Sequence, residues 1–247
     1  HVLFSYRQFL LALNSQRTFD TTMDLDFLRL IGKLKTVPRA GWVLRGIHDP
    51  ESVADHSWRM SVMALFLLQD LPTVNAVRAC QIALVHDLAE AEVGDITPFD
   101  GITPEDKHQR EHDAMFSISR MLTHCTTANS ASSAQLLELY QEYDKGETLE
   151  AQYVKDIDKL DMYLQADAYE RSHRTKPDLQ SFFIGAQQKM KTEWGLNVLR
   201  ALEHERNERK RGEKDTNDKT ESVRNVVFAV SVVGLSLVHV GWSWVKR

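Results

Sequence analysis

The chain has 247 residues, 43% of them hydrophobic, so it can form one domain with an ordinary buried core and still leave terminal extensions. Its formal net charge of −5 argues against a broad surface for binding a nucleic-acid polymer. Its two cysteines, Cys80 and Cys125, lack the spacing of a metal-binding pair and are too few for a disulfide framework.

Residues 1–22 are expected to be an N-terminal extension. The stretch contains Arg7 and Arg17 but no acidic residue before Asp20, a composition similar to part of an organelle transit peptide. An ordinary amphipathic extension accounts for the same residues, so both interpretations stand.

Residues 23–205 are expected to fold as one all-α domain, because apolar residues recur with helical spacing and strand-like alternation is scarce. Ser52 is a suitable N-cap, and Pro72 separates the helix that it begins from the next one. The predicted helices span residues 25–35, 52–69, 75–91, 104–122, 134–143, 148–172 and 179–206.

The C-terminal part divides into a mixed-charge linker, residues 206–224, and a hydrophobic segment, residues 225–247. Residues 226–245 contain no Asp, Glu, Lys or Arg, and a helix of that length would cross a hydrocarbon core of about 30 Å. Trp242 and Trp244 are placed as interface anchors are. The segment predicts a tail anchor with the domain facing the cytoplasm; a buried terminal helix or strand is the alternative, since Gly234 and Gly241 weaken a membrane span.

The most informative motif is the pair His86-Asp87. Divalent metals bind imidazole nitrogen together with carboxylate oxygen, and Ala79, Ala83, His86 and Glu90 share one face of the predicted helix. Adjacent residues on one turn cannot surround an ion, so other ligands have to come from other helices. Taken alone, the same residues also fit a solvated helix end.

Isolated residues on two other predicted helices could supply those ligands. His56 lies in the first turn of its helix, although an isolated histidine on an apolar face is more often a core residue than a ligand. The helix over residues 148–172 offers Asp156, Asp158 and Asp161, and periodicity does not select among them.

The order His56, His86-Asp87, Asp158 resembles the pattern of the HD-domain metal-dependent phosphohydrolases. Longer segments resemble the 5′-deoxynucleotidase family within that group, over about residues 24–205. These segments are PRAGW (38–42), ESVADH (51–56), ALVHDLAE (83–90), VGDI (93–96) and VKDID (154–158). The resemblance implies an HD-domain helical bundle with a metal site in its core.

The resemblance also implies two cation sites. The implied ligands of the first cation are His56, His86, Asp87 and Asp158. Such a set suits Mn²⁺, Co²⁺ or Fe²⁺ and can hold Zn²⁺. A second cation, Mg²⁺ or Mn²⁺, is implied at Glu90, Asp95 and the backbone carbonyl of Ile96.

Catalytic and substrate-binding roles follow from the same resemblance. Glu90 and Asp87 are the implied catalytic residues, with Glu90 placed to accept a proton from water unless it coordinates the second cation tightly. Arg39 is expected to grip phosphate, and Trp42 to cover a sugar or base face. Asp95 has a competing role at a sugar hydroxyl; without the resemblance it is simply a polar loop residue.

The implied activity is hydrolysis of a deoxyribonucleoside 5′-monophosphate, by a homodimer that uses Mn²⁺, Co²⁺ or Mg²⁺. A phosphodiesterase or a nucleotide polyphosphate hydrolase would keep the fold, but the loop over residues 37–55 contains few cationic groups for extra phosphates. A third alternative is a non-catalytic, membrane-tethered helical adaptor. The retention of Glu90 and Asp95 beside all of the implied ligands argues against it.

Overall fold

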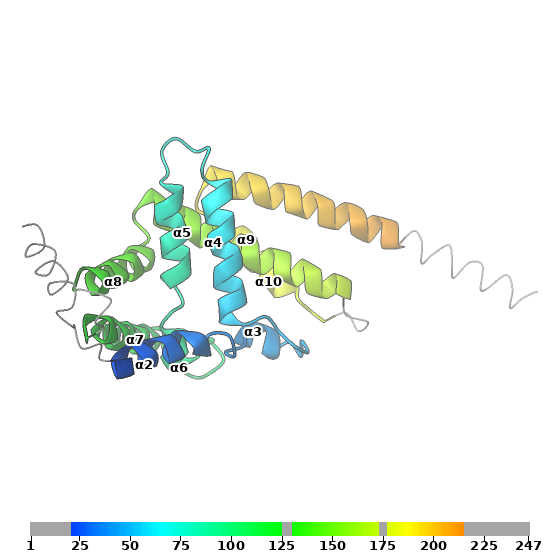
Figure 1. The fold of residues 1–247 in the computed structure, drawn as a ribbon. Helices are drawn as coiled ribbons and strands as arrows, with labels where there is room; N and C mark the ends of the chain where they lie inside the picture. Colours follow the sequence, from blue (N-terminus) through cyan, green and yellow to red (C-terminus); the bar gives the residue numbers. More distant parts are fainter. Residues whose placement is uncertain (1–20, 125–129, 173–176, 215–247) are drawn as a thin grey trace, which may run out of the picture. The chain divides into compact units, whose positions relative to one another are not determined.

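The computed structural model describes residues 21–124, 130–172 and 177–214, and Figure 1 shows that they are mainly helical. They divide into a first compact unit that ends at Leu196 and a second that starts at Asn197 and is helical as far as residue 214. The first unit contains α2 (Thr21–Lys33), α3 (Ala40–Val43), α4 (Val53–Leu67), α5 (Ala76–Val85), α6 (Glu90–Val93), α7 (Pro104–His124), α8 (Ser130–Lys145), α9 (Leu149–Ser172) and α10 (Gln180–Lys189).

The all-α prediction is confirmed. Within the described residues the β-structure amounts to one isolated antiparallel bridge, between Pro38 and Ser52. Helix α9 is the centre of the first unit, because it packs against α4, α5, α8 and α10 (Figure 1). Its residues Val154, Ile157 and Leu160 are fully buried, which is the apolar stripe expected of a helix that others surround.

The first turn of α4 is fixed by a capping box. The Asp55 N–H donates to Oγ of Ser52 at 3.1 Å, and the Ser52 N–H donates to Oδ2 of Asp55 at 2.9 Å. These bonds satisfy backbone groups that a helix start leaves without intrahelical partners. The N-cap prediction for Ser52 is therefore confirmed, and the ordered turn carries His56.

The helix predicted over residues 75–91 is wrong as a continuous element. Helix α5 ends at Val85 and α6 begins at Glu90, with turns between them. The Leu88 N–H donates to the Val85 carbonyl at 3.0 Å and the Glu90 N–H to the Asp87 carbonyl at 3.1 Å. Such i to i+3 bonds wind the backbone more tightly than an α-helix. The single helix face predicted for Ala79, Ala83, His86 and Glu90 therefore does not continue beyond His86.

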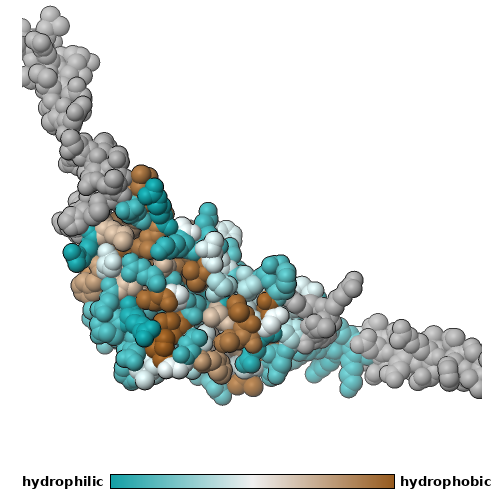
Figure 2. All heavy atoms as spheres, turned by 90° about the horizontal axis from the view of Figure 1, so that it is seen from below, coloured by the Kyte–Doolittle hydropathy of each residue, from teal (hydrophilic) through white to brown (hydrophobic). Residues whose placement is uncertain are grey.

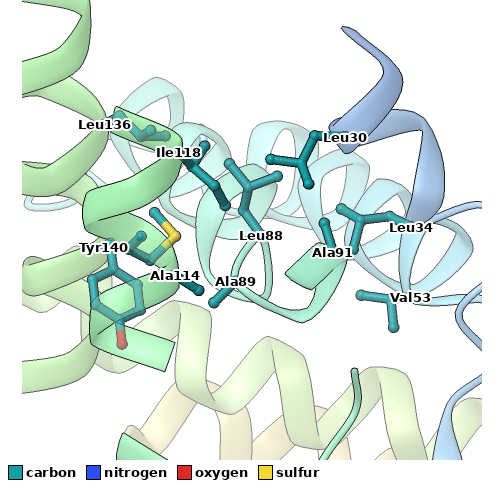
Figure 3. Close-up of a cluster of buried hydrophobic side chains, with 11 residues drawn as sticks. Leu30, Leu34, Val53, Leu88, Ala89, Ala91, Ala114, Ile118, Leu136 and Tyr140 are labelled. Atoms are coloured by element: carbon teal, nitrogen blue, oxygen red, sulfur yellow. The ribbon is translucent and has the colours of Figure 1, made fainter. Parts of the chain in front are cut away.

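The turn after α5 is anchored in a hydrophobic cluster. Leu88, Ala89 and Ala91 are buried there, and Figure 3 shows Leu88 between Leu30 of α2 and Ile118 of α7. A second cluster, which includes Met60, Ile82 and Ile157, joins α4, α5 and α9. Burial of Leu88, Ala89 and Ala91 holds the turn after α5 in place. The polar side chains of that turn therefore point in fixed directions.

The helix predicted over residues 179–206 is also interrupted. Helix α10 ends at Lys189, and Met190 adopts an extended conformation (φ −62°, ψ 138°). The buried carboxylate of Asp156 accepts the N–H groups of Lys191 at 2.7 Å and Thr192 at 2.8 Å. This tertiary contact satisfies backbone groups that a continuous helix would have paired within itself.

Hydrophobic side chains are also present on the surface. Trp58 and Phe66 on α4 are 66% and 59% exposed, and Figure 2 shows hydrophobic patches among hydrophilic residues on one face. Among the described residues, no helix has the length and apolar character needed to cross a membrane. The predicted N-terminal extension, residues 1–22, lies outside the described residues except for Thr21 and Thr22, which begin α2. The segment of the tail-anchor prediction, residues 226–245, also lies outside them.

Candidate metal centre and substrate cavity

Three buried residues from different helices converge in the first unit. His56 lies in the first turn of α4, His86 caps the end of α5, and Asp158 lies within α9. Each offers one ligand atom, and the three atoms lie within 4.8 Å of one another. The predicted location of candidate metal ligands in the bundle core is thereby confirmed.

Asp87, the fourth predicted ligand, borders this group. Its Oδ2 lies 3.1 Å from Nε2 of His86 and 3.8 Å from Nε2 of His56. In a regular α-helix neighbouring side chains diverge by about 100°, whereas the tight turn after α5 lets His86 and Asp87 face one another. Because the helix breaks after α5, the neighbouring residues His86 and Asp87 can both approach the same ion.

Both imidazoles present the same nitrogen to the group. Nδ1 of His86 lies 2.8 Å from the Ala83 carbonyl, which can only accept a hydrogen bond, so the proton is on Nδ1 and the lone pair on Nε2. Nδ1 of His56 lies 2.7 Å from Oδ2 of Asp161, and its Nε2 lies 3.4 Å from Oδ1 of Asp158. Among the described residues, the buried Nε2 of His56 has no hydrogen-bond partner. A metal ion would satisfy it.

The charges around the group favour a cation. Burial disfavours ionised Asp158, but Lys159, His56 and His86 outweigh burial and hold the pKa of Asp158 well below its usual range. Burial and Arg39 lower the pKa of His56, whereas the neighbouring carboxylates of Asp158 and Asp161 raise it, to about 9 overall. Without metal, the site therefore retains a proton that a divalent cation can replace.

Arg39 extends from the loop before α3 into a cluster of acids. Its Nη1 lies 3.0 Å from Oδ2 of Asp87, 3.8 Å from Oδ2 of Asp95 and 4.0 Å from Oε1 of Glu90. Burial alone would lower the pKa of Arg39, but these carboxylates raise it. Oδ2 of Asp95 also accepts the N–H of Ala40, the residue after Arg39, at 2.8 Å. The predicted substrate-binding residues Arg39 and Asp95 are therefore held side by side.

Glu90 is only 3% exposed and points into this cluster. Burial, followed by the charges of Asp87 and Asp95, raises its pKa well above the usual range. Its Oε2 has no hydrogen-bond partner among the residues that the structure describes. A buried carboxyl group with a raised pKa is the kind of group that exchanges protons during catalysis.

The carbonyl of Ile96, predicted as a ligand of a second cation, already has a cationic partner. Nζ of Lys107 donates to it at 2.8 Å and lies 3.4 Å from Oε1 of Glu111. The predicted ligands Glu90 and Asp95 lie near Arg39, as described above. A second cation that used the Ile96 carbonyl would therefore compete with an ammonium group.

Trp42 is held on several sides and is only 2% exposed. Its Nε1–H donates to Oε1 of Glu51 at 2.9 Å. Its ring centroid lies 4.3 Å from that of Phe182 and 5.4 Å from that of Tyr169. Trp42 is thus part of a rigid aromatic wall rather than an exposed stacking platform.

Two cavities meet at the acidic cluster, and both are lined by Arg39, Asp95 and Met162. The larger, about 290 Å³, is also lined by His86, Asp87, Glu90, Lys107, Asp158 and Lys159. The smaller, about 230 Å³, is also lined by Trp42, Ile96, Pro98 and Phe182. A charged chamber beside the candidate ligands thus adjoins a chamber with mainly apolar walls, a division that suits a ligand with one ionic and one apolar part.

Several residues of the site were not predicted. Tyr143 donates to Oδ2 of Asp158 at 3.3 Å, and Nζ of Lys159 lies 2.5 Å from the same oxygen. Lys107 lines the charged chamber from α7. Nothing local in the sequence marks these residues. Asp161, by contrast, is one of the acids named above as candidates, and its place on the apolar stripe of α9 indicates a carboxylate that must be paired when buried.

The fold and the candidate centre agree with the sequence comparison. A family profile described as an HD domain matches residues 31–196. The chain therefore belongs to the HD-domain family. Within it, 5′-deoxynucleotidase HDDC2 of Danio rerio is 43% identical over 182 residues, covering 74% of this chain and 87% of the relative. The Homo sapiens HDDC2 is 42% identical, with 74% and 85% covered.

A further relative and two solved structures extend the likeness. The 5′-deoxynucleotidase hdd1 of Schizosaccharomyces pombe is 44% identical over 156 residues, covering 63% of this chain and 77% of the relative. A solved structure of a conserved hypothetical protein from Pyrococcus furiosus has a TM-score of 0.57 and 33% identity, with 73% of this chain and 97% of that chain covered. The HD domain-containing protein YGK1 has a TM-score of 0.56 and 26% identity, with 81% and 93% covered. The predicted membership of the 5′-deoxynucleotidase family is thereby confirmed.

Proposed function

We propose that this chain is a metal-dependent phosphoric monoester hydrolase that converts deoxyribonucleoside 5′-monophosphates to deoxynucleoside and phosphate. The observation that carries the proposal is the buried group of His56, His86 and Asp158 beside a chamber lined by Arg39. The substrate class is supported by the names of relatives that are 43% and 42% identical.

His56, His86, Asp87 and Asp158 would hold one divalent cation, with Mn²⁺, Co²⁺ or Mg²⁺ favoured and Fe²⁺ or Zn²⁺ as alternatives. When bound, such a cation lowers the pKa of water and neutralises charge on a phosphate. The orientation of both Nε2 atoms and the unsatisfied Nε2 of His56 support this ligand set.

Glu90 would accept the proton of the attacking water. It is buried and its Oε2 has no partner within the described residues. Its raised pKa makes the carboxylate a stronger base once a bound cation favours its ionised form. Asp87 would serve catalysis as a ligand. Its Oδ2 lies close to both imidazoles and to Arg39, so the same oxygen couples the metal centre to the phosphate-binding side.

Arg39 would bind the phosphate oxygens. A guanidinium has five N–H donors in a fixed plane, so Arg39 can keep its contact with Asp87 and still reach a substrate. The nucleoside part would occupy the smaller chamber, where Trp42 forms part of the wall and Asp95 lies at the junction with the charged chamber. A sugar hydroxyl at that junction would meet Asp95.

A second cation at Glu90, Asp95 and the Ile96 carbonyl is a separate proposal. It would require Lys107 to release the carbonyl and Glu90 to give up its proton. Metal analysis of the purified protein distinguishes the two stoichiometries, because one ion per chain leaves Glu90 free to act as a base.

The decisive experiment is a substrate panel assayed with the full-length chain and Mn²⁺, Co²⁺ or Mg²⁺. Phosphate release from dAMP or dGMP is expected, whereas turnover only of cyclic nucleotides or triphosphates would favour the phosphodiesterase or polyphosphate alternatives. Asp87→Ala should abolish release. Asp156→Asn is the matched control, because Asp156 is a buried carboxylate of α9 whose partners are Lys191 and Thr192. Wild-type turnover by Asp87→Ala would overturn the proposed centre.

Assembly and location belong to the same proposal. We expect a homodimer, to be tested by light scattering of the purified chain. A cytoplasm-facing domain anchored through residues 226–245 predicts that full-length protein resists carbonate extraction from membranes. The non-catalytic adaptor gains no support, since the relatives are named as enzymes.

A further inference from the structure

His56 is held by a carboxylate that does not belong to the proposed ligand set. Asp161 lies three residues after Asp158 on α9 and is fully buried. Its Oδ2 lies 2.7 Å from Nδ1 of His56, while Nε2 on the other side of the ring lies 3.4 Å from Oδ1 of Asp158. One turn of α9 therefore supplies both a candidate ligand and the carboxylate that orients another.

Arg59 in turn holds Asp161. Its Nε donates to Oδ1 of Asp161, and its Nη2 donates to the Asp161 backbone carbonyl at 3.0 Å. Its Nη1 donates to Oε1 of Gln165 at 2.8 Å. Because Arg59 follows His56 by three residues on α4, its guanidinium joins α4, which carries His56, to α9, which carries Asp158.

The same contacts reach the wall of the smaller chamber. Oε2 of Glu51 lies 3.6 Å from Nη2 of Arg59, and Oε1 accepts the indole N–H of Trp42 at 2.9 Å. The backbone of Glu51 is also held, because its N–H donates to the Tyr169 hydroxyl oxygen at 2.8 Å. A continuous set of polar contacts therefore runs from the chamber wall to His56.

We propose that Asp161 and Arg59 are positioning residues of the metal centre. Asp161 keeps the proton of His56 on Nδ1 and directs the Nε2 lone pair to the ion, and Arg59 keeps Asp161 aimed at His56. The inference rests on the proposed metal-dependent function. Removing a partner of this kind typically weakens metal affinity by about 10- to 100-fold.

Asp161→Asn tests this role with almost no change in shape. Two N–H donors, from His56 and Arg59, converge on the carboxylate, but an asparagine offers only one acceptor oxygen and a donor amide. An amide nitrogen turned towards His56 would favour the tautomer protonated on Nε2, which blocks the ion. An amide nitrogen turned towards Arg59 would break the hydrogen bond between Arg59 and residue 161. The asparagine side chain would then no longer be held in the orientation that Asp161 has.

The measurement is titration of metal-free, full-length protein with Co²⁺, followed by its visible absorption and by calorimetry. Asp161→Asn should weaken Co²⁺ binding by about 10- to 100-fold, and Arg59→Gln by about tenfold. Asp156→Asn is the control, since Asp156 is equally buried on the same helix but caps the turn at Lys191 and Thr192. It should lower thermal stability and leave the Co²⁺ affinity unchanged.

The outcomes separate this inference from the proposed function. If the wild-type chain binds Co²⁺ and hydrolyses dAMP while Asp161→Asn and Arg59→Gln bind Co²⁺ equally well, the inference alone is overturned. A wild-type chain that does not bind Co²⁺ overturns both. If Asp161→Asn does not fold, unchanged affinity in Arg59→Gln decides against the inference. An equal loss of affinity in Asp156→Asn also decides against it, because affinity would then follow stability.

Discussion

Glu90→Gln is the substitution that most sharply separates proton transfer from metal binding. Glutamine has nearly the same shape as glutamate, and the site is only 3% exposed, so the surrounding packing should be kept. Glutamine cannot accept the proton from water. General-base catalysis contributes about 10²- to 10⁴-fold, which corresponds to roughly 3–5 kcal/mol of barrier at 1.36 kcal/mol per factor of ten.

The same variant makes a prediction about stability. The pKa of Glu90 is raised well above its ordinary value of 4.5, by burial first and then by Asp87 and Asp95. A carboxyl group whose pKa is raised by folding favours the folded state least at high pH, because the unfolded chain then releases the proton more readily. Without metal, Glu90→Gln should therefore resist urea as well as or better than wild type at neutral pH, and the advantage should shrink as the pH falls towards 4.5.

The assay measures kcat for phosphate release from dAMP at saturating Mn²⁺, together with Co²⁺ affinity. We expect kcat to fall by about 10²- to 10⁴-fold with Co²⁺ affinity retained. A loss smaller than about tenfold would refute the role of Glu90 as the proton acceptor. A loss of one bound ion per chain would instead assign Glu90 to a second cation site.

Three further predictions address the metal, the phosphate and the fold. Chelation with EDTA should abolish phosphate release and lower the Tm, since a ligand at 100 times its Kd stabilises a protein by about 2.7 kcal/mol; turnover and a Tm that EDTA leaves unchanged would contradict this. Arg39→Met should raise KM for dAMP by about 10- to 100-fold, as expected for a charged hydrogen bond, while Arg78→Met, which removes an arginine paired with carboxylates of α8, should not. Ser52→Ala should lower the free energy of unfolding by about 0.5–2 kcal/mol in urea denaturation, and an unchanged value would show that the capping box does not stabilise α4.

Local patterns in the sequence were sufficient to predict the helical class and the start of α4, whereas the meeting of His56, His86 and Asp158 was implied by the family resemblance. The helical class and the start of α4 depend on short-range chemistry or on apolar spacing. The choice of Asp158 came only from the family resemblance, because Asp161 lies on the same helix and is also buried. Which acid faces the ion depends on how α9 is rotated against α4, which periodicity does not determine.

The features that sequence reasoning missed all depend on tertiary contacts. The turn after α5 forms because Leu88 and its neighbours are buried among α2 and α7. The break after α10 follows from Asp156, 35 residues earlier than its partner Lys191. Trp42 could not be recognised as an enclosed wall residue without Glu51, Tyr169 and Phe182 around it.

A crystal structure of the chain grown with Mn²⁺, with anomalous diffraction data, tests the central claim most directly. The proposed ligand set predicts one strong anomalous peak bounded by Nε2 of His56, Nε2 of His86 and a carboxylate oxygen of Asp158. Saturating Mn²⁺ with no peak among these atoms, or a peak held by other residues, would contradict it.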